Sequence, residues 1–454
     1  MSEYAEFLAG KSVEDGPSGF VDVPELNNSM FPFQKDITGW ALRRGRAAVF
    51  AGCGLGKSLI QIEWAKHIPG DVLILAPLAV SAQTVREGLK FGIAVNRCKS
   101  QDDVKPGINI TNYERLGSFN ASKFAGIVLD ESSILKSLDG KTRTLIIESF
   151  AQTPYRLAAT ATPSPNDYME LGNHAEFLGV MTRQEMLAMY FVHDGGDTQQ
   201  WRIKGHAQED FWKWICSWAV MIQKPFDLGY ENEGFNIPPL KMHEHMVRAT
   251  KAAEGELFAM PAATLQERIS ARRSTINERA HRAAALVNAS KEQWIVWCNL
   301  NGESNRLKKL IPDSVEVVGA DTPEYKEKSI EDFVSKKTRV IISKASMFGH
   351  GLNLQGCHNM AFVGISDSYE EFYQALRRCY RFGQKKTVNA HVIIADTEGA
   401  VIQNLKRKEK DMENMSAEMV RNMQDLNSTA LRGSTKRNDS GYRPVVNMMV
   451  PGWI

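Results

Sequence analysis

Short apolar runs recur along the first third of the chain and are separated by helix-like stretches. Five of these runs lie at residues 47–50, 72–75, 108–110, 127–129 and 157–159. Their apolar character is continuous and not alternating, which is typical of strands buried on both faces of a parallel sheet. The pattern therefore predicts a doubly wound α/β domain.

A second series of apolar runs, again with helical spacers, lies at residues 294–297, 315–318, 340–342, 361–363 and 388–394. Two α/β domains in tandem, each with a doubly wound parallel sheet, are therefore expected. The expected division is an N-terminal extension at 1–30, a first α/β domain at 31–174, a helical, aromatic-rich insertion and connector at 175–290, a second α/β domain at 291–400, and a C-terminal helix and tail at 401–454.

The predicted insertion is rich in aromatic side chains. They are Tyr190, Phe191, Trp201, Phe211, Trp212, Trp214 and Trp218. Aromatic stripes at helical spacing usually pack inward, so an aromatic core is favoured over the alternative of a base-stacking surface.

A helix predicted at residues 265–287 carries four arginines, Arg268, Arg272, Arg279 and Arg282. At 100° per residue they fall within about 80° of one another. A solvated face is favoured, while a phosphate-facing brace or an inter-domain contact stays open.

Composition narrows the class of protein only slightly. The chain has 454 residues, a formal charge of +2, 43% apolar and 24% charged residues, which is typical of a soluble globular protein of two or three domains. A charge of +2 excludes a polybasic protein, so any nucleic acid has to be met by a local basic surface.

Cysteine spacing and the apolar pattern bear on location. The six cysteines, at 53, 98, 216, 298, 357 and 379, are scattered without the close pairs of a zinc or redox motif, which favours a reducing compartment. The first residues lack the pattern of a signal peptide, and no apolar stretch reaches the roughly 18 residues of a membrane span. We expect a cytoplasmic protein.

The run at residues 51–58, Ala-Gly-Cys-Gly-Leu-Gly-Lys-Ser, has the pattern of a phosphate-binding loop. Gly52, Gly54 and Gly56 would let backbone N–H groups close around phosphate oxygens. Lys57 would supply a cation to the terminal phosphates, and the Ser58 hydroxyl would hold Mg²⁺. Ala stands where the common pattern begins with Gly, so this run alone is only moderately specific.

Asp130 and Glu131 directly follow the apolar run at 127–129. Both carboxylates would then emerge at the carboxyl end of a parallel strand, where doubly wound sheets bind ligands. We expect Asp130 to orient the Mg²⁺ shell and Glu131 to position and deprotonate an attacking water. An isolated pair of this kind is more often a surface helix start, but the preceding phosphate loop favours the catalytic interpretation.

Arg378 and Arg381 come more than 300 residues after the phosphate loop. Their spacing predicts one shared helix face, from which a second domain could offer two guanidiniums to a transferring γ-phosphoryl group. The alternative is that they brace the second domain through acidic partners.

Two further residues have weaker signals. Thr160 ends the run at 157–159, where its hydroxyl could link the γ-phosphate to a neighbouring domain, although threonines at strand ends are often caps. The amide of Gln34 could present a donor and an acceptor to adenine, although a lone glutamine is usually solvated.

The order of these runs resembles superfamily 2 nucleic-acid motors, and within them the Swi/Snf-type translocases. Residues 33–34 resemble the adenine-reading motif, 54–58 the phosphate loop, 76–78 and 111–114 two strand-contacting motifs, 130–133 the carboxylate motif, 160–163 the coupling motif, and 349–354 and 374–384 the last two motifs. The resemblance covers about residues 31–397 and implies two RecA-like motor domains.

The resemblance also implies roles for further residues. Gly351 and Gln374 would join the nucleotide site, and the candidate nucleic-acid contacts are Pro77, Thr111, Tyr113 and Asn353. Four positions depart from the family pattern. Ser133 and Tyr380 replace histidines, Thr84 stands where Trp is common, and Phe348 stands where Gly is usual.

These features predict a DNA-stimulated ATPase that uses ATP and Mg²⁺ to step along duplex DNA. The compact form resembles versions carried by bacteria and phages, and the family's long flanking modules are not expected, so chromatin remodelling is not implied. A targeting protein partner stays open and no membrane is expected. Two rivals also stay open: a strand-separating helicase of DNA or RNA, and an ATP-controlled clamp on DNA or a partner.

Overall fold

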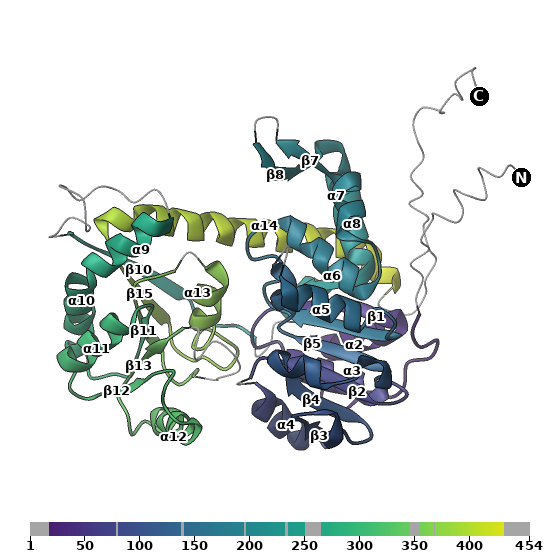
Figure 1. Ribbon diagram of the computed structural model, residues 1–454, viewed down its shortest axis with the longest axis horizontal. Helices are drawn as coiled ribbons and strands as arrows, with labels where there is room; N and C mark the ends of the chain where they lie inside the picture. The colour runs from purple at the N-terminus through teal and green to yellow at the C-terminus, as the bar shows by residue number, and fades with distance from the viewer. Residues whose placement is uncertain are drawn as a thin grey trace, which may run out of the picture.

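The computed structural model describes residues 18–78, 80–137, 140–194, 197–231, 235–249, 265–345, 354–366 and 368–430. Two parallel sheets flanked by helices make up two successive parts of the chain (Figure 1). The predicted fold class, two α/β domains in tandem, is confirmed. Within the described residues, no helix combines the length and apolarity needed to cross a membrane.

The first sheet has the strand order β3-β4-β2-β5-β6-β1-β9, and every paired strand is parallel. Its strands are β1 (Arg46–Ala51), β2 (Val72–Ala76), β3 (Val95–Arg97), β4 (Ile108–Asn112), β5 (Gly126–Asp130), β6 (Tyr155–Thr160) and β9 (Ala219–Ile222). Because helices cover both faces, the central strands are almost wholly buried, which explains their continuous apolar runs.

The second sheet has the order β10-β15-β14-β11-β13-β12 and is also parallel throughout. Its strands are β10 (Leu240–Val247), β11 (Trp294–Cys298), β12 (Ser314–Val317), β13 (Val340–Lys344), β14 (Asn359–Val363) and β15 (Val388–Ala395). All five predicted runs of the second series are strands of this sheet.

The helices of the first part are α2 (Pro32–Arg44), α3 (Lys57–His67), α4 (Ser81–Lys90), α5 (Lys141–Ser149), α6 (Leu171–Leu178), α7 (Arg183–Tyr190) and α8 (Gln208–Trp218). Those of the second part are α9 (Leu265–Ser274), α10 (Ile276–Asn288), α11 (Asn301–Leu310), α12 (Pro323–Val334), α13 (Tyr369–Leu376) and α14 (Gly399–Ala430).

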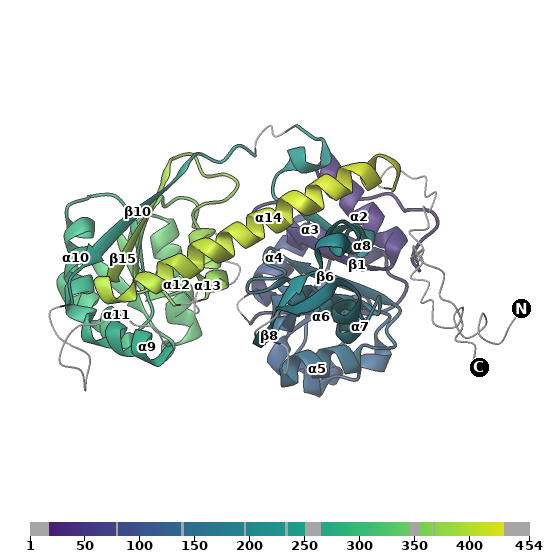
Figure 2. The ribbon, with the colours of Figure 1, turned by 90° about the horizontal axis from the view of Figure 1, so that it is seen from above.

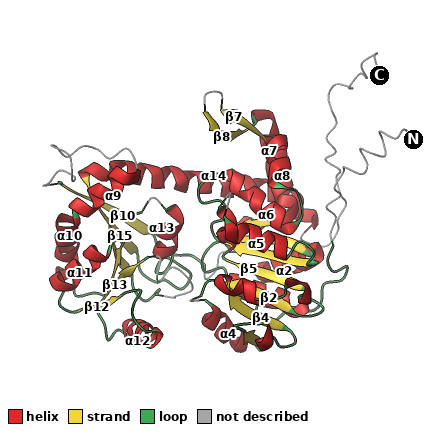
Figure 3. Cartoon of the chain, in the orientation of Figure 1, coloured by secondary structure: helices red, strands yellow, loops and turns green. Residues whose placement is uncertain are grey.

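The helical assignment of residues 175–290 needs correction. Strands β7 (Phe191–Asp194) and β8 (Asp197–Ile203) form a hairpin that projects beside α7 (Figure 3). Farther along, β9 pairs with β1 of the first sheet and β10 pairs with β15 of the second. The first sheet therefore extends beyond the expected boundary at residue 174, and the second sheet begins before residue 291.

Helix α14 starts in the second domain and crosses to the first, where it packs on α8 and β9 (Figure 2). Four methionines at helical spacing form its buried stripe: Met412, Met415, Met419 and Met423. Polar contacts fix both ends of the crossing, because Lys406 pairs with Glu244 and the Tyr168 hydroxyl donates to the Asp411 carbonyl.

The aromatic side chains of the middle region form a core, as predicted. Tyr190, Phe191, Phe211, Trp212 and Trp218 are all buried. The Phe211 ring packs edge-on against Phe191 and Trp212 at centroid distances of 5.4 and 4.9 Å. This packing leaves these rings no free face for stacking on bases.

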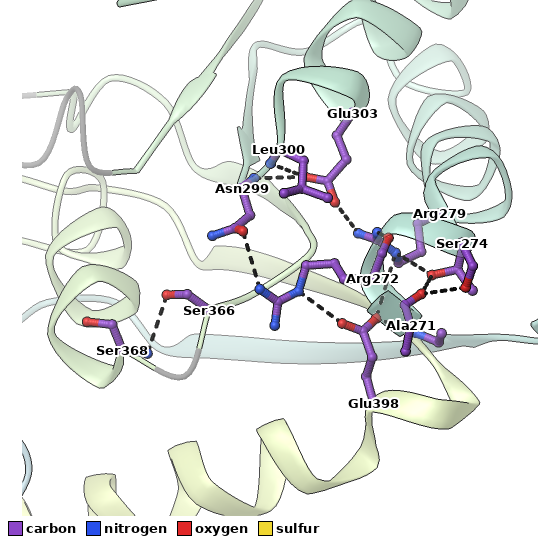
Figure 4. Close-up of polar contacts among 12 residues, drawn as sticks. Ala271, Arg272, Ser274, Arg279, Asn299, Leu300, Glu303, Ser366, Ser368 and Glu398 are labelled. Carbon is purple, nitrogen blue, oxygen red and sulfur yellow. Dashed lines mark hydrogen bonds and ion pairs between the residues drawn. The ribbon is translucent and has the colours of Figure 1, made fainter. Parts of the chain in front are cut away.

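Two of the four arginines of the predicted helix at 265–287 do not lie on the favoured solvated face. The helix is interrupted at Thr275, and Arg272 and Arg279 are buried, whereas Arg282 is exposed and the side chain of Arg268 lies outside the description. The Arg279 Nη1 atom lies 2.5 Å from Glu303 Oε1, and the Arg272 Nε atom lies 3.1 Å from Glu398 Oε1 (Figure 4). Two buried cations thus face two buried carboxylates, which tie α9 and α10 to α11 and to the segment before α14.

Candidate nucleotide site between the two domains

The phosphate loop connects the end of β1 to the start of α3. Gly54 has φ 92° and Gly56 has φ 80°, left-handed conformations that an L side chain rarely adopts. A Cβ at Gly56 would also lie 2.3 Å from the Gln34 Nε2 atom. Among the described residues no side chain caps the N-terminus of α3, so its first N–H groups remain available for an anion.

The polar groups of the loop hold its shape. The Lys57 Nζ atom donates to the Ala51 carbonyl at 2.9 Å, and half-buried Ser58 is the second residue of α3. Gln34 is buried, donates from Nε2 to the Leu55 carbonyl at 2.9 Å, and accepts the Phe31 N–H at Oε1. In this conformation Gln34 therefore braces the loop, with one donor and one acceptor position of its amide already used.

Asp130 is the last residue of β5 and Glu131 follows it. Strand β1 leads into the phosphate loop, and one strand lies between β1 and β5. That strand is β6, whose Thr160 pairs with Phe50 and whose Ala159 pairs with Asp130. The Asp130 Oδ1 atom accepts from Gln61 Nε2 at 2.9 Å, and burial raises the pKa of Asp130 to about 6. The parallel topology thus brings loop, hydroxyl and carboxylates to one edge of the sheet.

Glu131 has an unusual backbone for a non-glycine residue, with φ 62°. Its Oε1 atom accepts from the Thr160 hydroxyl at 2.5 Å and lies 3.3 Å from the Ser133 hydroxyl. Left-handed non-glycine residues are strained and concentrate at functional sites. Thr160 therefore contacts the second carboxylate directly, and its role as a nucleotide contact stays a prediction.

The arginine segment belongs to the second domain, but its predicted geometry is wrong. Helix α13 ends at Leu376, so Arg378 and Arg381 lie in the turn beyond it and share no helix face. Tertiary bonds hold this turn: the Leu354 N–H donates to the Arg378 carbonyl, and Gln384 Nε2 donates to that of Cys379.

This turn nevertheless lies against the phosphate loop. A Cβ at Gly54 would lie 2.9 Å from the Phe382 backbone nitrogen. Burial lowers the pKa of Arg378 to about 10; the Arg381 charge acts in the same direction and the Glu131 charge opposes it. The buried Nε atom of Arg381 has no hydrogen-bond partner among the described residues. The position of Arg381 beside the phosphate loop suits a guanidinium that binds the oxygens of a ligand.

Several expected contacts are placed differently or not described. Thr111 and Tyr113 are buried, and the Tyr113 hydroxyl donates to the Asp130 carbonyl at 2.8 Å, so neither side chain offers DNA a surface here. Pro77 is half-buried at the end of β2. Gly351 and Asn353 lie outside the described residues.

Three residues near the site escaped the sequence interpretation. Gln61 lies one turn after Lys57 on α3, a spacing that could have placed it on the same face. Phe382 contacts the phosphate loop, and Glu370 contacts both Ser133 and Gln374. Glu370 stands four residues before Gln374 on α13, so helical spacing could have predicted that these two side chains lie close together. Nothing in the sequence indicated that Glu370 contacts Ser133 of the other domain.

Comparison with known proteins gives three results. Residues 278–383 match the helicase conserved C-terminal domain family. SWI/SNF-related matrix-associated actin-dependent regulators of chromatin subfamily A-like protein 1 from Xenopus tropicalis and Xenopus laevis are each 22% identical and match 82% and 84% of this chain. The chain spans 43% of the length of these curated relatives. The Sulfolobus solfataricus SWI2/SNF2 ATPase core in complex with dsDNA aligns over 91% of this chain and 99% of its own, at 15% identity and a TM-score of 0.41.

Tandem α/β domains, a phosphate loop with facing arginines, and the matched helicase domain define a superfamily 2 helicase-type core. More narrowly, the motif series resembles the Swi/Snf type, and the two curated relatives have SWI/SNF-related names.

Proposed function

We propose that this protein is an ATPase stimulated by DNA, which converts ATP hydrolysis into stepping along duplex DNA. The observation that carries the proposal is the approach of the second domain's arginine turn to the phosphate loop at Gly54 and Phe382. A nucleotide held between the domains would then draw ligands from both, and its hydrolysis would change how the domains meet.

The donor set at the sheet edge fits a nucleotide with Mg²⁺. Two left-handed glycines and an uncapped helix N-terminus form a cradle for phosphate oxygens, with Lys57 beside it. Ser58 and Asp130 would hold the metal, which when bound neutralises charge on the phosphates. Glu131, held by Thr160, would orient and deprotonate the attacking water.

Arg381 and Arg378 would stabilise the charge that develops on the γ-phosphoryl oxygens. Both come from the second domain, so hydrolysis would require the two domains to be closed. Release after hydrolysis would let them separate, and alternating grips on the phosphate backbone would give net movement without base readout.

The choice of duplex DNA follows the resemblance to the Swi/Snf branch. A compact bacterial or phage-like form in the cytoplasm, associated with the nucleoid when on DNA, is part of the same proposal, with a targeting partner open. The strand-separating helicase and the ATP-controlled clamp are its rivals.

The first experiment measures ATP hydrolysis with no nucleic acid, duplex DNA, single-stranded DNA and RNA. Stimulation by duplex DNA is expected, and stimulation by RNA alone would overturn the substrate. Triplex displacement beside unwinding of a forked duplex, each with ATP and a non-hydrolysable analogue, then separates the three functions. A translocase displaces the triplex strand with ATP only, a helicase separates the fork, and a clamp does neither.

The catalytic carboxylate gives a sharper test. Glu131→Gln keeps the shape of the side chain but removes the base, so turnover should fall by about 10²-fold or more while ATP binding is retained. Lys57→Ala should instead weaken nucleotide binding itself. Near-normal turnover in Glu131→Gln would remove the assignment of the base.

A further inference from the structure

A carboxylate of the second domain contacts the catalytic segment of the first. Glu370, in the first turn of α13, accepts from the Ser133 hydroxyl at 2.5 Å and forms an ion pair with Lys136. The Glu370 side chain is only 10% exposed, whereas that of Lys136 is 40% exposed. The contact therefore combines a largely desolvated hydrogen bond with a half-exposed ion pair, and it spans more than 230 residues of sequence.

Ser133 lies two residues after Glu131, and its hydroxyl has a single proton. That hydroxyl is 2.5 Å from Glu370 but 3.3 Å from the Glu131 Oε1 atom. Because one hydroxyl donates to one acceptor at a time, the shorter contact takes the proton. Glu131 then depends on the Thr160 hydroxyl, which holds the same Oε1 atom at 2.5 Å.

Glu370 also fixes the arginine turn at the other end of the contact. Helix α13 is eight residues long and runs from Tyr369 directly into the turn with Arg378 and Arg381. Within the helix, Gln374 Nε2 lies 3.4 Å from the Glu370 Oε1 atom. Contacts that hold Glu370 in place therefore constrain the orientation of α13 and the position of the arginines that follow it.

We infer that Glu370 is a positioning residue that couples the catalytic carboxylate segment of the first domain to the arginine turn of the second. This inference rests on the proposed function. When Ser133 and Lys136 hold Glu370, Glu131 and the arginines are set in one geometry, and when the domains part, the contact is lost. Ser133 and Glu370 form a pair that joins the two halves of the site.

The test compares Glu370→Ala, Glu370→Gln and Ser133→Ala with a matched control. Glu371→Gln is that control, because Glu371 is the next residue of the same helical turn but accepts from Ser366 within its own domain, at 2.9 Å. Each protein is assayed for DNA-stimulated turnover, for affinity toward a fluorescent ATP analogue, and for amide hydrogen exchange in residues 131–137 and 369–384.

Glu370→Ala should lower kcat by roughly 10- to 100-fold, the scale expected when a charge-assisted hydrogen bond that orients a site is lost. Affinity for the analogue should stay within about twofold, since no phosphate contact is removed. Exchange should rise in both segments together, although they belong to different domains. Lys136→Glu combined with Glu370→Lys should recover part of the kcat that either change loses alone.

The remaining outcomes overturn the inference. If kcat is unchanged in Glu370→Ala, with or without faster exchange, the contact of Glu370 does not position the site. A fall in kcat with unchanged exchange in residues 131–137 removes the coupling between the domains. If the unaltered protein hydrolyses no ATP, the proposed function has failed, and the exchange measurements alone then decide whether Glu370 couples the two segments.

Discussion

Two pairs of arginines in the second domain have different surroundings. Arg272 and Arg279 are buried and face Glu398 and Glu303 inside their own domain, where each charge has a buried carboxylate partner. The turn that carries Arg378 and Arg381 faces the phosphate loop of the other domain. Burying a guanidinium is costly unless it is paired, so the fold satisfies the first pair, whereas the second pair lies beside the proposed nucleotide site.

The contrast shows why arginine spacing alone misleads. Both pairs were assigned to helix faces, one solvated and one catalytic, from spacing along the chain. In the first pair the acidic partners come from α11 and from the segment before α14, far away in sequence. In the second pair no helix exists at the arginines. What separates a structural from a catalytic arginine is the partner, which spacing does not reveal.

The largest expected effect comes from Arg381→Ala. If Arg381 reaches the γ-phosphate, DNA-stimulated hydrolysis should fall by about 10³-fold, with ATP binding and thermal stability nearly unchanged. Lys at this position should not rescue hydrolysis, because an ammonium lacks the planar fork that engages several oxygens. Stability and hydrolysis are measured on one preparation, and a folded variant with unaltered turnover would place Arg381 with the structural pair.

The opposite profile is expected for Arg279→Ala. Removing this guanidinium leaves Glu303 buried without its cation, which should lower the free energy of unfolding by about 3–5 kcal/mol. Urea unfolding followed by fluorescence measures the loss, and turnover per folded molecule should remain normal. Arg282→Ala serves as the control, since Arg282 is exposed on the same helix. Full stability with lost hydrolysis would mean that Arg279 acts in the nucleotide site and not in the stability of its domain.

The sheets could be predicted from sequence because their strands are buried on both faces and carry an unbroken apolar signal. Edge strands lack that signal: β10 alternates Leu, Lys, Met, His, Glu, His, Met and Val, and only its pairing with β15 makes it a strand. The short strand β9 directly follows the Trp-rich helix α8, and its apolar sequence resembles a continuation of that helix. Local patterns therefore predicted the centres of both sheets and the edge strand β12, and missed the edge strands β3, β9 and β10.

The candidate site divides in the same way. The phosphate loop and the carboxylates were predictable because each is one short run whose chemistry follows from adjacent residues. The turn after α13 was not, since it is held by bonds to residues that are not adjacent in sequence, such as that from the Leu354 N–H to the Arg378 carbonyl. Neither was Glu370, whose partners Ser133 and Lys136 are in the other domain.

A smaller effect, which depends on pH, should distinguish the buried histidines from the paired arginines. Burial, together with His243, His245 and Arg282, lowers the pKa of His391 to about 4. Its pKa is thus lower in the folded than in the unfolded chain, so its neutral form contributes stability above the unfolded value near 6.5. That contribution is lost as the pH falls below about 6.5 toward 4.

Urea unfolding at pH 7.5 and pH 5.5 measures this effect. Between these pH values, the midpoint of the unaltered protein should fall relative to that of His391→Gln, which keeps a polar side chain but cannot titrate. Buried His174 has a pKa lowered to about 4 and buried Asp130 has a pKa raised to about 6, and their opposing contributions are shared by both proteins. An equal change of the midpoint in the two proteins would contradict the assignment.

The smallest expected effect concerns Arg282, the exposed member of the arginine series. Its Nη2 atom lies 3.0 Å from His245 Nδ1, and His245 Nε2 lies 2.9 Å from His391 Nδ1. Burial and then the Arg282 charge lower the pKa of His245.

Arg282→Ala removes the cation but not the burial, so the pKa of His245 should rise while staying below its ordinary value. Stability should change by less than about 0.5 kcal/mol, as is usual for exposed positions. Histidine titration by NMR measures the shift. An unchanged pKa would mean that burial alone sets the value, and a large loss of stability would place Arg282 with the structural pair.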